Sequence, residues 1–128
     1  MNKSFLLIDT DVIIDYLRNR PEAVEFLEQS DSNFYISPIT IAELYAGVRD
    51  GDERIKLETF VEAFQSIPVD DSIAQQGGLF KRDYGKSHGV GLADAIIAAS
   101  SEKMGAILVT LNKKHFPMLS NILTPYEK

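Results

Sequence analysis

The chain has 128 residues, 45% hydrophobic and 25% charged, which suits one globular domain over residues 1–128 with a core of its own. Thirteen Lys and Arg against nineteen Asp and Glu give a net charge of −6, so nucleic acid would have to be bound through clustered basic residues or a metal ion. The lack of cysteine excludes disulfides and Cys-based zinc sites. No apolar run approaches the roughly 18–20 residues of a membrane-spanning helix, and we expect a cytoplasmic protein with no membrane partner.

Apolar strands and amphipathic helices alternate along the chain. Strands are expected at Phe5–Ile8, Asn33–Ile36, 67–69 and 106–109. Helices are expected at 10–17, 22–29, 40–48, 51–65, 72–84 (weakened by Gly77 and Gly78) and Leu92–Met104, with a basic, glycine-containing loop at 81–91 and an irregular end at 116–126. This alternation predicts the α/β class, with a central parallel sheet flanked by helices.

Two of the predicted strands end in polar clusters. Ile8 is followed by Asp9-Thr10-Asp11, and Val109 is followed by Thr110-Leu111-Asn112. Ligands of open α/β sheets bind beyond the carboxyl ends of the strands, so we expect the chemistry of the protein at this edge.

Three carboxylates are candidates for that chemistry, and each also has a plain structural explanation. Asp9 suits the N-cap of the helix that starts at Thr10. Glu43 follows Thr40 by three residues, which is the spacing of a capping box. Asp94 falls in the first turn of an apolar helix, where the helix dipole stabilises a negative charge.

Taken together, Asp9, Glu43 and Asp94 indicate a metal site. All three lie in apolar sequence surroundings without a nearby Lys or Arg to pair with them, and burial of an unpaired charge is costly. A divalent cation would neutralise all three. Hard oxygen ligands without cysteine favour Mg²⁺ or Mn²⁺ over zinc, and such an ion can activate water to attack a phosphodiester.

The sequence resembles the PIN-domain ribonucleases and, more narrowly, the VapC toxins of prokaryotic toxin–antitoxin pairs. The resemblance is carried by four blocks, DTDVIIDYL at 9–17, SPITIAELYAG at 37–47, LADAIIAA at 92–99 and LVTLNKKHF at 108–116, and it spans essentially the whole chain. It implies a Rossmann-like fold, Mg²⁺- or Mn²⁺-dependent cleavage of RNA, homodimers and inhibition by a cognate antitoxin. By position, Asp9, Glu43 and Asp94 match the first three acidic residues of the family's site, and Asn112 is a further possible ligand.

One position departs from the family pattern. A fourth acid is common three residues beyond the position of Asn112, and this chain has His115 there. That substitution puts a second metal ion in doubt. His115 is either a substrate contact or a surface residue packed beside Phe116.

Other polar residues have both functional and structural explanations. Thr10 and Thr110 can orient water or carboxylates, or simply cap. Asp11 is either an outer carboxylate of the site or has a solvated or capping role. The candidates for gripping RNA phosphates are Lys81, Arg82, Lys86 and Lys113, although such basic runs are often solvated surface.

Three alternatives compete with this interpretation. A phosphoacceptor receiver domain needs an aspartate at the end of a central strand, whereas Glu43 falls within a helical pattern. Aspartate-nucleophile phosphatases need a longer chain and a catalytic lysine. The remaining alternative is a catalytically weak or inactive PIN fold that only binds RNA.

Overall fold

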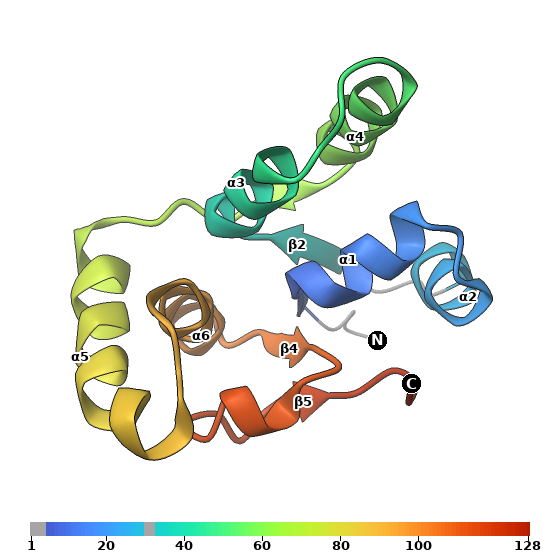
Figure 1. Cartoon of the computed structure of the whole chain (residues 1–128). Coiled ribbons are helices and arrows are strands. Elements are labelled where there is room, and N and C mark those ends of the chain that lie inside the picture. Colours follow the sequence, from blue (N-terminus) through green and yellow to red (C-terminus); the bar gives the residue numbers. More distant parts are fainter. Residues whose placement is uncertain (1–4, 30–32) are drawn as a thin grey trace.

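Five parallel strands form the sheet at the centre of the molecule. The structure is a computed structural model that describes residues 5–29 and 33–128. The strands are β1 (Phe5–Ile8), β2 (Asn33–Ile36), β3 (Gln65–Ser66), β4 (Ile107–Val109) and β5 (Ile122–Leu123). Their order across the sheet is β3-β2-β1-β4-β5, and every neighbouring pair is parallel (Figure 1). The α/β class and the parallel sheet predicted from the sequence are therefore confirmed.

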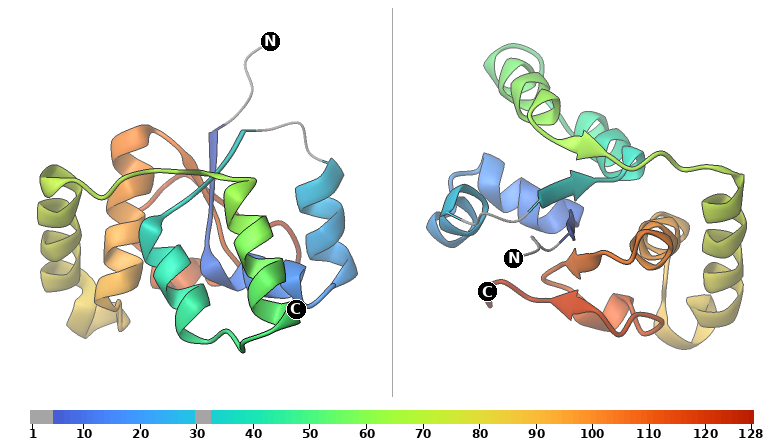
Figure 2. Two further views of the ribbon diagram at one scale, coloured as in Figure 1. Left: turned by 90° about the horizontal axis from the view of Figure 1, so that it is seen from above. Right: turned by 180° about the vertical axis from the view of Figure 1, so that it is seen from behind.

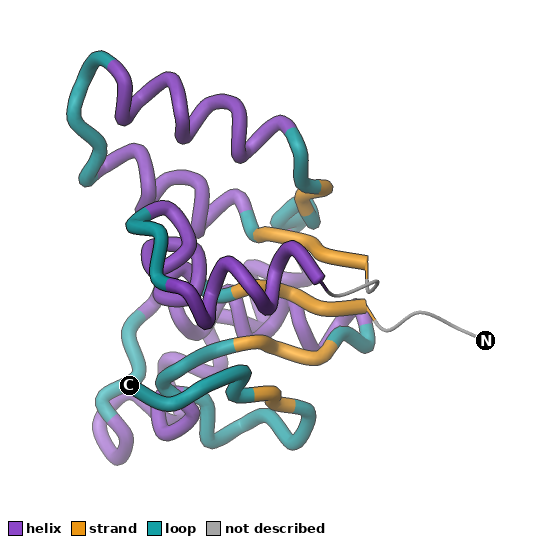
Figure 3. Tube along the Cα trace, turned by 90° about the vertical axis from the view of Figure 1, so that its right-hand side faces the viewer, coloured by secondary structure: helices purple, strands orange, loops and turns teal. Residues whose placement is uncertain are grey.

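Helices cover both faces of this sheet (Figures 1 and 2). They are α1 (Thr10–Leu17), α2 (Pro21–Gln29), α3 (Pro38–Ala46), α4 (Asp52–Glu62), α5 (Asp71–His88) and α6 (Leu92–Met104). A short 3₁₀ helix, η1 (Lys113–His115), follows β4. Figure 3 shows the strands side by side between the helical layers. None of the helices in the described ranges is long and apolar enough to span a membrane.

Alternate residues of the central strands point into two separate cores, as the period of a strand requires. Leu7 of β1 and Leu108 of β4 are fully buried against α5 and α6. Leu6 and Ile8 of β1 face the opposite way and pack with residues of α1, α2, α3 and α4. Because both faces are covered, β1 is a continuous apolar run, which is why it could be predicted.

The two edge strands differ from the sequence expectation. The strand expected at 67–69 is instead β3 at Gln65–Ser66, which pairs with Tyr35 and Ile36 of β2. Its two side chains are exposed and polar, so no apolar run marked it. The helix expected over 51–65 ends earlier, at Glu62. Within the end expected to be irregular, Ile122–Leu123 pairs with β4 as β5.

The start of α3 also differs from the expectation. Its N-cap is Ser37, whose hydroxyl accepts a hydrogen bond from the Ile39 N–H at 3.0 Å. Thr40 is fully buried inside the helix, so the predicted capping box of Thr40 and Glu43 is wrong. Pro38 at the first helical position explains the earlier start, because its fixed φ suits a first turn.

The basic loop predicted at 81–91 is mostly helix. Helix α5 continues to His88 and ends at Gly89, which has the left-handed φ of +66° that favours glycine. The helix continues through Gly77, where a Cβ would lie 2.8 Å from Ile96 Cγ1. Glycine at this position lets α5 pack closely on α6.

Candidate active site

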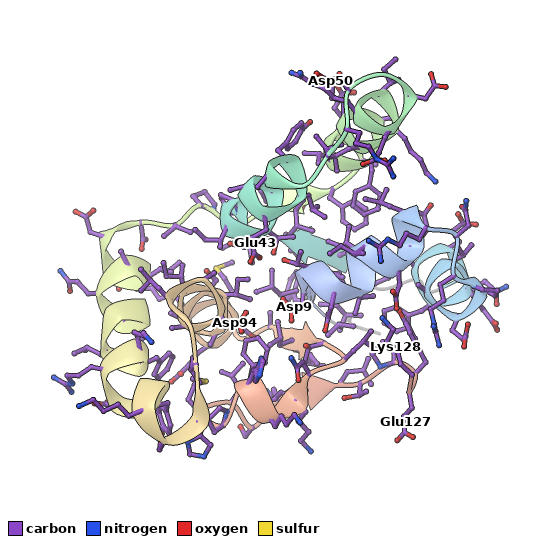
Figure 4. The ribbon with its side chains drawn as sticks, viewed as in Figure 1. Asp9, Glu43, Asp50, Asp94, Glu127 and Lys128 are labelled. Carbon is purple, nitrogen blue, oxygen red and sulfur yellow. The ribbon has the colours of Figure 1, made fainter. Side chains whose placement is uncertain are left out.

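Asp9, Glu43 and Asp94 gather at the carboxyl edge of the sheet (Figure 4). Asp9 directly follows β1, Glu43 lies on α3 and Asp94 lies in the first turn of α6. The negative charge of Asp94 raises the pKa of Asp9, and that of Glu43 raises the pKa of Asp94. The structure therefore brings together the three carboxylates singled out from the sequence.

Asp9 is the most buried of the three. Its side chain accepts a 2.8 Å hydrogen bond from the Thr10 N–H and another from the Thr110 hydroxyl, also at 2.8 Å. Burial, followed by the negative charge of Asp11, raises the pKa of Asp9 from 3.8 to about 7, against the opposing effect of those two hydrogen bonds. A cation bound beside this carboxyl would stabilise its ionised form and lower the pKa again.

Asp94 is half-buried on α6. Burial raises its pKa above the ordinary value, and the charge of Glu43 adds to that effect while His115 opposes it. His115 Nδ1 lies 3.6 Å from Asp94 Oδ2, too far for a hydrogen bond. The same nitrogen is 2.8 Å from Asn112 Nδ2, so Asn112 and His115 stand together beside Asp94.

Glu43 departs from the expectation that all three carboxylates are desolvated. It is exposed, although the sequence around it is apolar. Its Oε1 accepts a 2.7 Å hydrogen bond from the Thr10 hydroxyl, which is also hydrogen-bonded to the buried Thr40 hydroxyl at 3.1 Å. Thr10 thus aims Glu43 toward the end of β1.

Thr110 and Asp11 bind the loop that follows β4 and hold it beside Asp9. Thr110 is fully buried, and its oxygen accepts the Asn112 N–H at 3.1 Å. Asp11 accepts the Leu111 N–H at 3.1 Å. Asp11 also accepts the Val12 N–H at 2.8 Å, so it helps to cap α1 while being partly buried against the loop after β4, and burial raises its pKa.

The chemistry of this set fits a divalent cation. None of the three carboxylates makes an ion pair with a Lys or Arg in the part of the chain that the structure describes. Across residues 5–29 and 33–128, no three Asp, Glu or His side chains are already close enough to form one coordination shell. Mg²⁺ usually takes only one or two carboxylates and keeps several waters, so such a site need not be closed in advance.

The predicted RNA-binding residues fall into two groups. Lys113 is exposed on η1, next to Asn112. Lys81, Arg82 and Lys86 are exposed on α5, and Arg82 is paired with Asp83 at 2.8 Å. Only Lys113 is therefore adjacent in sequence to the residues that line the carboxylate set.

A second buried carboxylate, that of Asp15, has no signal in the local sequence. It is 5% exposed and accepts hydrogen bonds from Tyr126 Oη at 2.9 Å and Lys128 Nζ at 3.0 Å, while Arg20 Nε lies 3.8 Å away. These contacts fasten the last residues of the chain to α1. They join positions more than 100 residues apart, which no local pattern reveals.

Comparisons with known proteins agree with this geometry. A model of the PIN domain family matches residues 6–119. Ribonuclease VapC19 of Mycobacterium tuberculosis is 38% identical over 124 residues, 94% of this chain and 98% of that protein. Ribonuclease VapC10 of the same organism is 34% identical over 124 residues, 94% of this chain and 92% of that protein.

A solved structure is similar over nearly the whole chain. It is described as a toxin–antitoxin complex from Klebsiella pneumoniae, and its matching chain superposes with a TM-score of 0.82 at 28% identity. The match covers 96% of this chain and 99% of the other. The sheet and helices described above are therefore those of a known fold.

Proposed function

This chain belongs to the PIN domain family, and from that premise we propose that it is an endoribonuclease, the toxin of a VapBC-type toxin–antitoxin pair. Its relatives at 38% and 34% identity are named ribonucleases, which supports the activity. The observation that carries the proposal is the gathering of Asp9, Glu43 and Asp94, without a Lys or Arg partner among the described residues, at the carboxyl edge of the sheet.

The site would hold Mg²⁺ or Mn²⁺ on the carboxylates of Asp9, Glu43 and Asp94, with Asn112 as a possible further ligand. A bound divalent ion supplies a water activated for attack on a phosphodiester and stabilises the charge that develops on the phosphate. Thr110 holds the Asp9 carboxylate through its 2.8 Å hydrogen bond, and Thr10 holds that of Glu43 at 2.7 Å. These two threonines keep the carboxylates oriented in the absence of an ion.

RNA would approach this edge past basic side chains that contact its phosphates. Lys113 is the nearest candidate, because it directly follows Asn112 on the exposed η1. Lys81, Arg82 and Lys86 on α5 form a second basic group. Since the whole chain carries a net charge of −6, local basic residues and the ion must together offset repulsion of the RNA.

The proposed partner is an antitoxin that covers the acidic site. The similar solved structure is described as a toxin–antitoxin complex, which supports a protein partner of that kind. An arginine of the antitoxin would suit a site of three carboxylates when no metal is bound. We further infer a homodimer in which each chain is a single domain over residues 1–128, acting in the cytoplasm.

Growth of an expressing cell tests the proposed function. Induction of the wild-type chain alone should arrest growth, and the Asp94→Asn variant should not. Glu102→Gln, an exposed change on the same helix α6, is the matched control and should arrest growth like the wild type. Normal growth with soluble, folded wild-type protein would count against a toxin and favour a PIN fold that only binds RNA.

A further inference from the structure

A fourth carboxylate, that of Asp11, lies in the first turn of α1, two residues after Asp9. Its Oδ2 accepts the Leu111 N–H at 3.1 Å and lies 3.5 Å from the Thr110 hydroxyl oxygen. Its Oδ1 accepts the Val12 N–H at 2.8 Å. Oδ2 therefore binds the loop after β4, whereas Oδ1 binds the backbone at the start of α1 itself.

Asp11 and Asp9 share the hydroxyl of Thr110. The oxygen of that hydroxyl is 2.8 Å from Asp9 Oδ2 and 3.5 Å from Asp11 Oδ2. A hydroxyl has one proton to donate, and the shorter contact takes it. The Thr110 hydroxyl therefore donates its proton to Asp9, and only the longer contact of 3.5 Å remains to Asp11.

The charge of Asp11 is not neutralised by its neighbours. Its hydrogen-bond donors are neutral, and no Lys or Arg forms an ion pair with it within the described ranges. Among charged groups, Asp11 acts on Asp9 more strongly than Asp94 does. An unpaired, partly buried charge so close to a ligand must influence the binding of a cation there.

We propose that Asp11 supplies the fourth negative charge of the metal site, in place of the acid that the family pattern has at the position of His115. This inference rests on the proposed function. Asp11 already binds the Leu111 and Val12 amides, so it is a positioning residue that attracts the ion and holds the loop carrying Asn112. The negative charge that an acid at the position of His115 on η1 would supply comes instead from Asp11 on α1.

The test is calorimetric titration of Mn²⁺ and of Mg²⁺ into the metal-free protein at one fixed pH. Asp11→Asn should weaken binding of both ions about tenfold, because it removes a charge without removing a ligand. Glu25→Gln makes the same change in net charge on the exposed side of α2 and should bind like the wild type. Wild-type affinity in Asp11→Asn would overturn the inference.

A second variant separates charge from structure. Asp11→Glu keeps the charge and should bind both ions with an affinity within about threefold of the wild type. A purely structural role of Asp11 predicts that Asp11→Glu loses as much affinity as Asp11→Asn. If thermal melts show that Asp11→Asn is unfolded, Asp11→Ser replaces it as the uncharged variant, because its hydroxyl can still cap the start of the helix. The same tenfold weakening is expected of Asp11→Ser, and unchanged affinity would overturn the inference.

Asp94→Asn distinguishes failure of this inference from failure of the proposed function. If Asp94→Asn loses metal binding and Asp11→Asn does not, the metal site stands and the role of Asp11 is wrong. If Asp94→Asn binds both ions like the wild type, the proposed metal site itself is wrong, and the inference falls with it.

Discussion

Thr110 donates its hydroxyl proton to Asp9 across 2.8 Å, although the two residues are 101 positions apart in the chain. They become neighbours because β1 and β4 run side by side in parallel, with Ile8 opposite Val109. Each residue comes directly after its strand, and the hydrogen bond between them is buried. The edge of the sheet thus places the first carboxylate of the site before any ion binds.

The raised pKa of Asp9 should make the metal-free protein less stable as pH rises. Its pKa is about 7 in the folded protein against an ordinary 3.8, so the folded state holds a proton between these values that the unfolded state has lost. The free energy of unfolding should therefore fall by roughly 2–3 kcal/mol between pH 5 and pH 8 on account of this group. Urea unfolding at both pH values in the presence of a chelator measures the decline.

Asp9→Asn removes that titration. The decline with pH should become smaller in this variant by the amount given above, while Glu25→Gln on exposed α2 should decline like the wild type. If the free energy of unfolding declines equally in the wild type and in Asp9→Asn, the pKa of Asp9 is not raised in the folded protein.

His115→Asp should tighten the binding of Mg²⁺. It restores an acid beside Asp94, where His115 Nδ1 now lies 3.6 Å from Asp94 Oδ2. Imidazole suits Mn²⁺ better than Mg²⁺, so the difference in affinity between the two ions should become smaller. Titration of both ions into this variant and into His88→Asp, an exposed control on α5, would decide it. Stoichiometry and affinities identical to the wild type would place His115 outside the site.

The two adjacent glycines of α5 should respond in opposite ways to alanine. A Cβ at Gly77 would lie 2.8 Å from Ile96 Cγ1 and 3.0 Å from Ile96 Cα, so Gly77→Ala should lower the free energy of unfolding by about 1–3 kcal/mol. A Cβ at Gly78 would meet nothing within 4 Å, and Gly78→Ala should raise it by about 0.5–1 kcal/mol. Chemical denaturation measures both, and equal effects would contradict the close packing of α5 on α6.

Tyr126→Phe should weaken the attachment of the last residues to α1. The lost hydrogen bond is to the Asp15 carboxylate, 5% exposed, so the expected cost is about 2 kcal/mol. Tyr45→Phe is the control, because the Tyr45 hydroxyl makes no hydrogen bond to the described residues, and it should be nearly neutral. A neutral Tyr126→Phe would mean that Lys128 and Arg20 alone satisfy Asp15.

Much of the fold could be predicted because continuous apolar runs in the sequence mark the segments that are buried in the structure. The sequence of β1 is apolar throughout because both faces of the sheet are covered, and the rule for parallel sheets placed Asp9 and Thr110 at one edge. The sequence predicts a weak point of α5 at Gly77, because the contact with Ile96 of α6 that requires glycine there is not a local feature. The basic residues that continue the helix to His88 have the composition of a loop.

Contacts between distant segments account for what sequence reasoning missed at the site. Glu43 is exposed although its sequence neighbours are apolar, because the buried side of α3 is formed by Thr40 and Leu44. Asp11 caps the start of α1 as its position predicts, but its second contact, to the N–H of Leu111 100 positions away, has no local signal. Local patterns indicate which residues are buried, but not which distant backbone amide satisfies them.

Cleavage of RNA by the purified protein tests the central proposal most directly. The wild type should cut a structured RNA in the presence of Mn²⁺ or Mg²⁺ and stop when a chelator removes the ion. Asp94→Asn should be inactive under the same conditions while folded, and Glu102→Gln, an exposed control on the same helix, should remain active. Undiminished cleavage by Asp94→Asn, or cleavage by the wild type in excess chelator, would contradict an active site built on Asp9, Glu43 and Asp94.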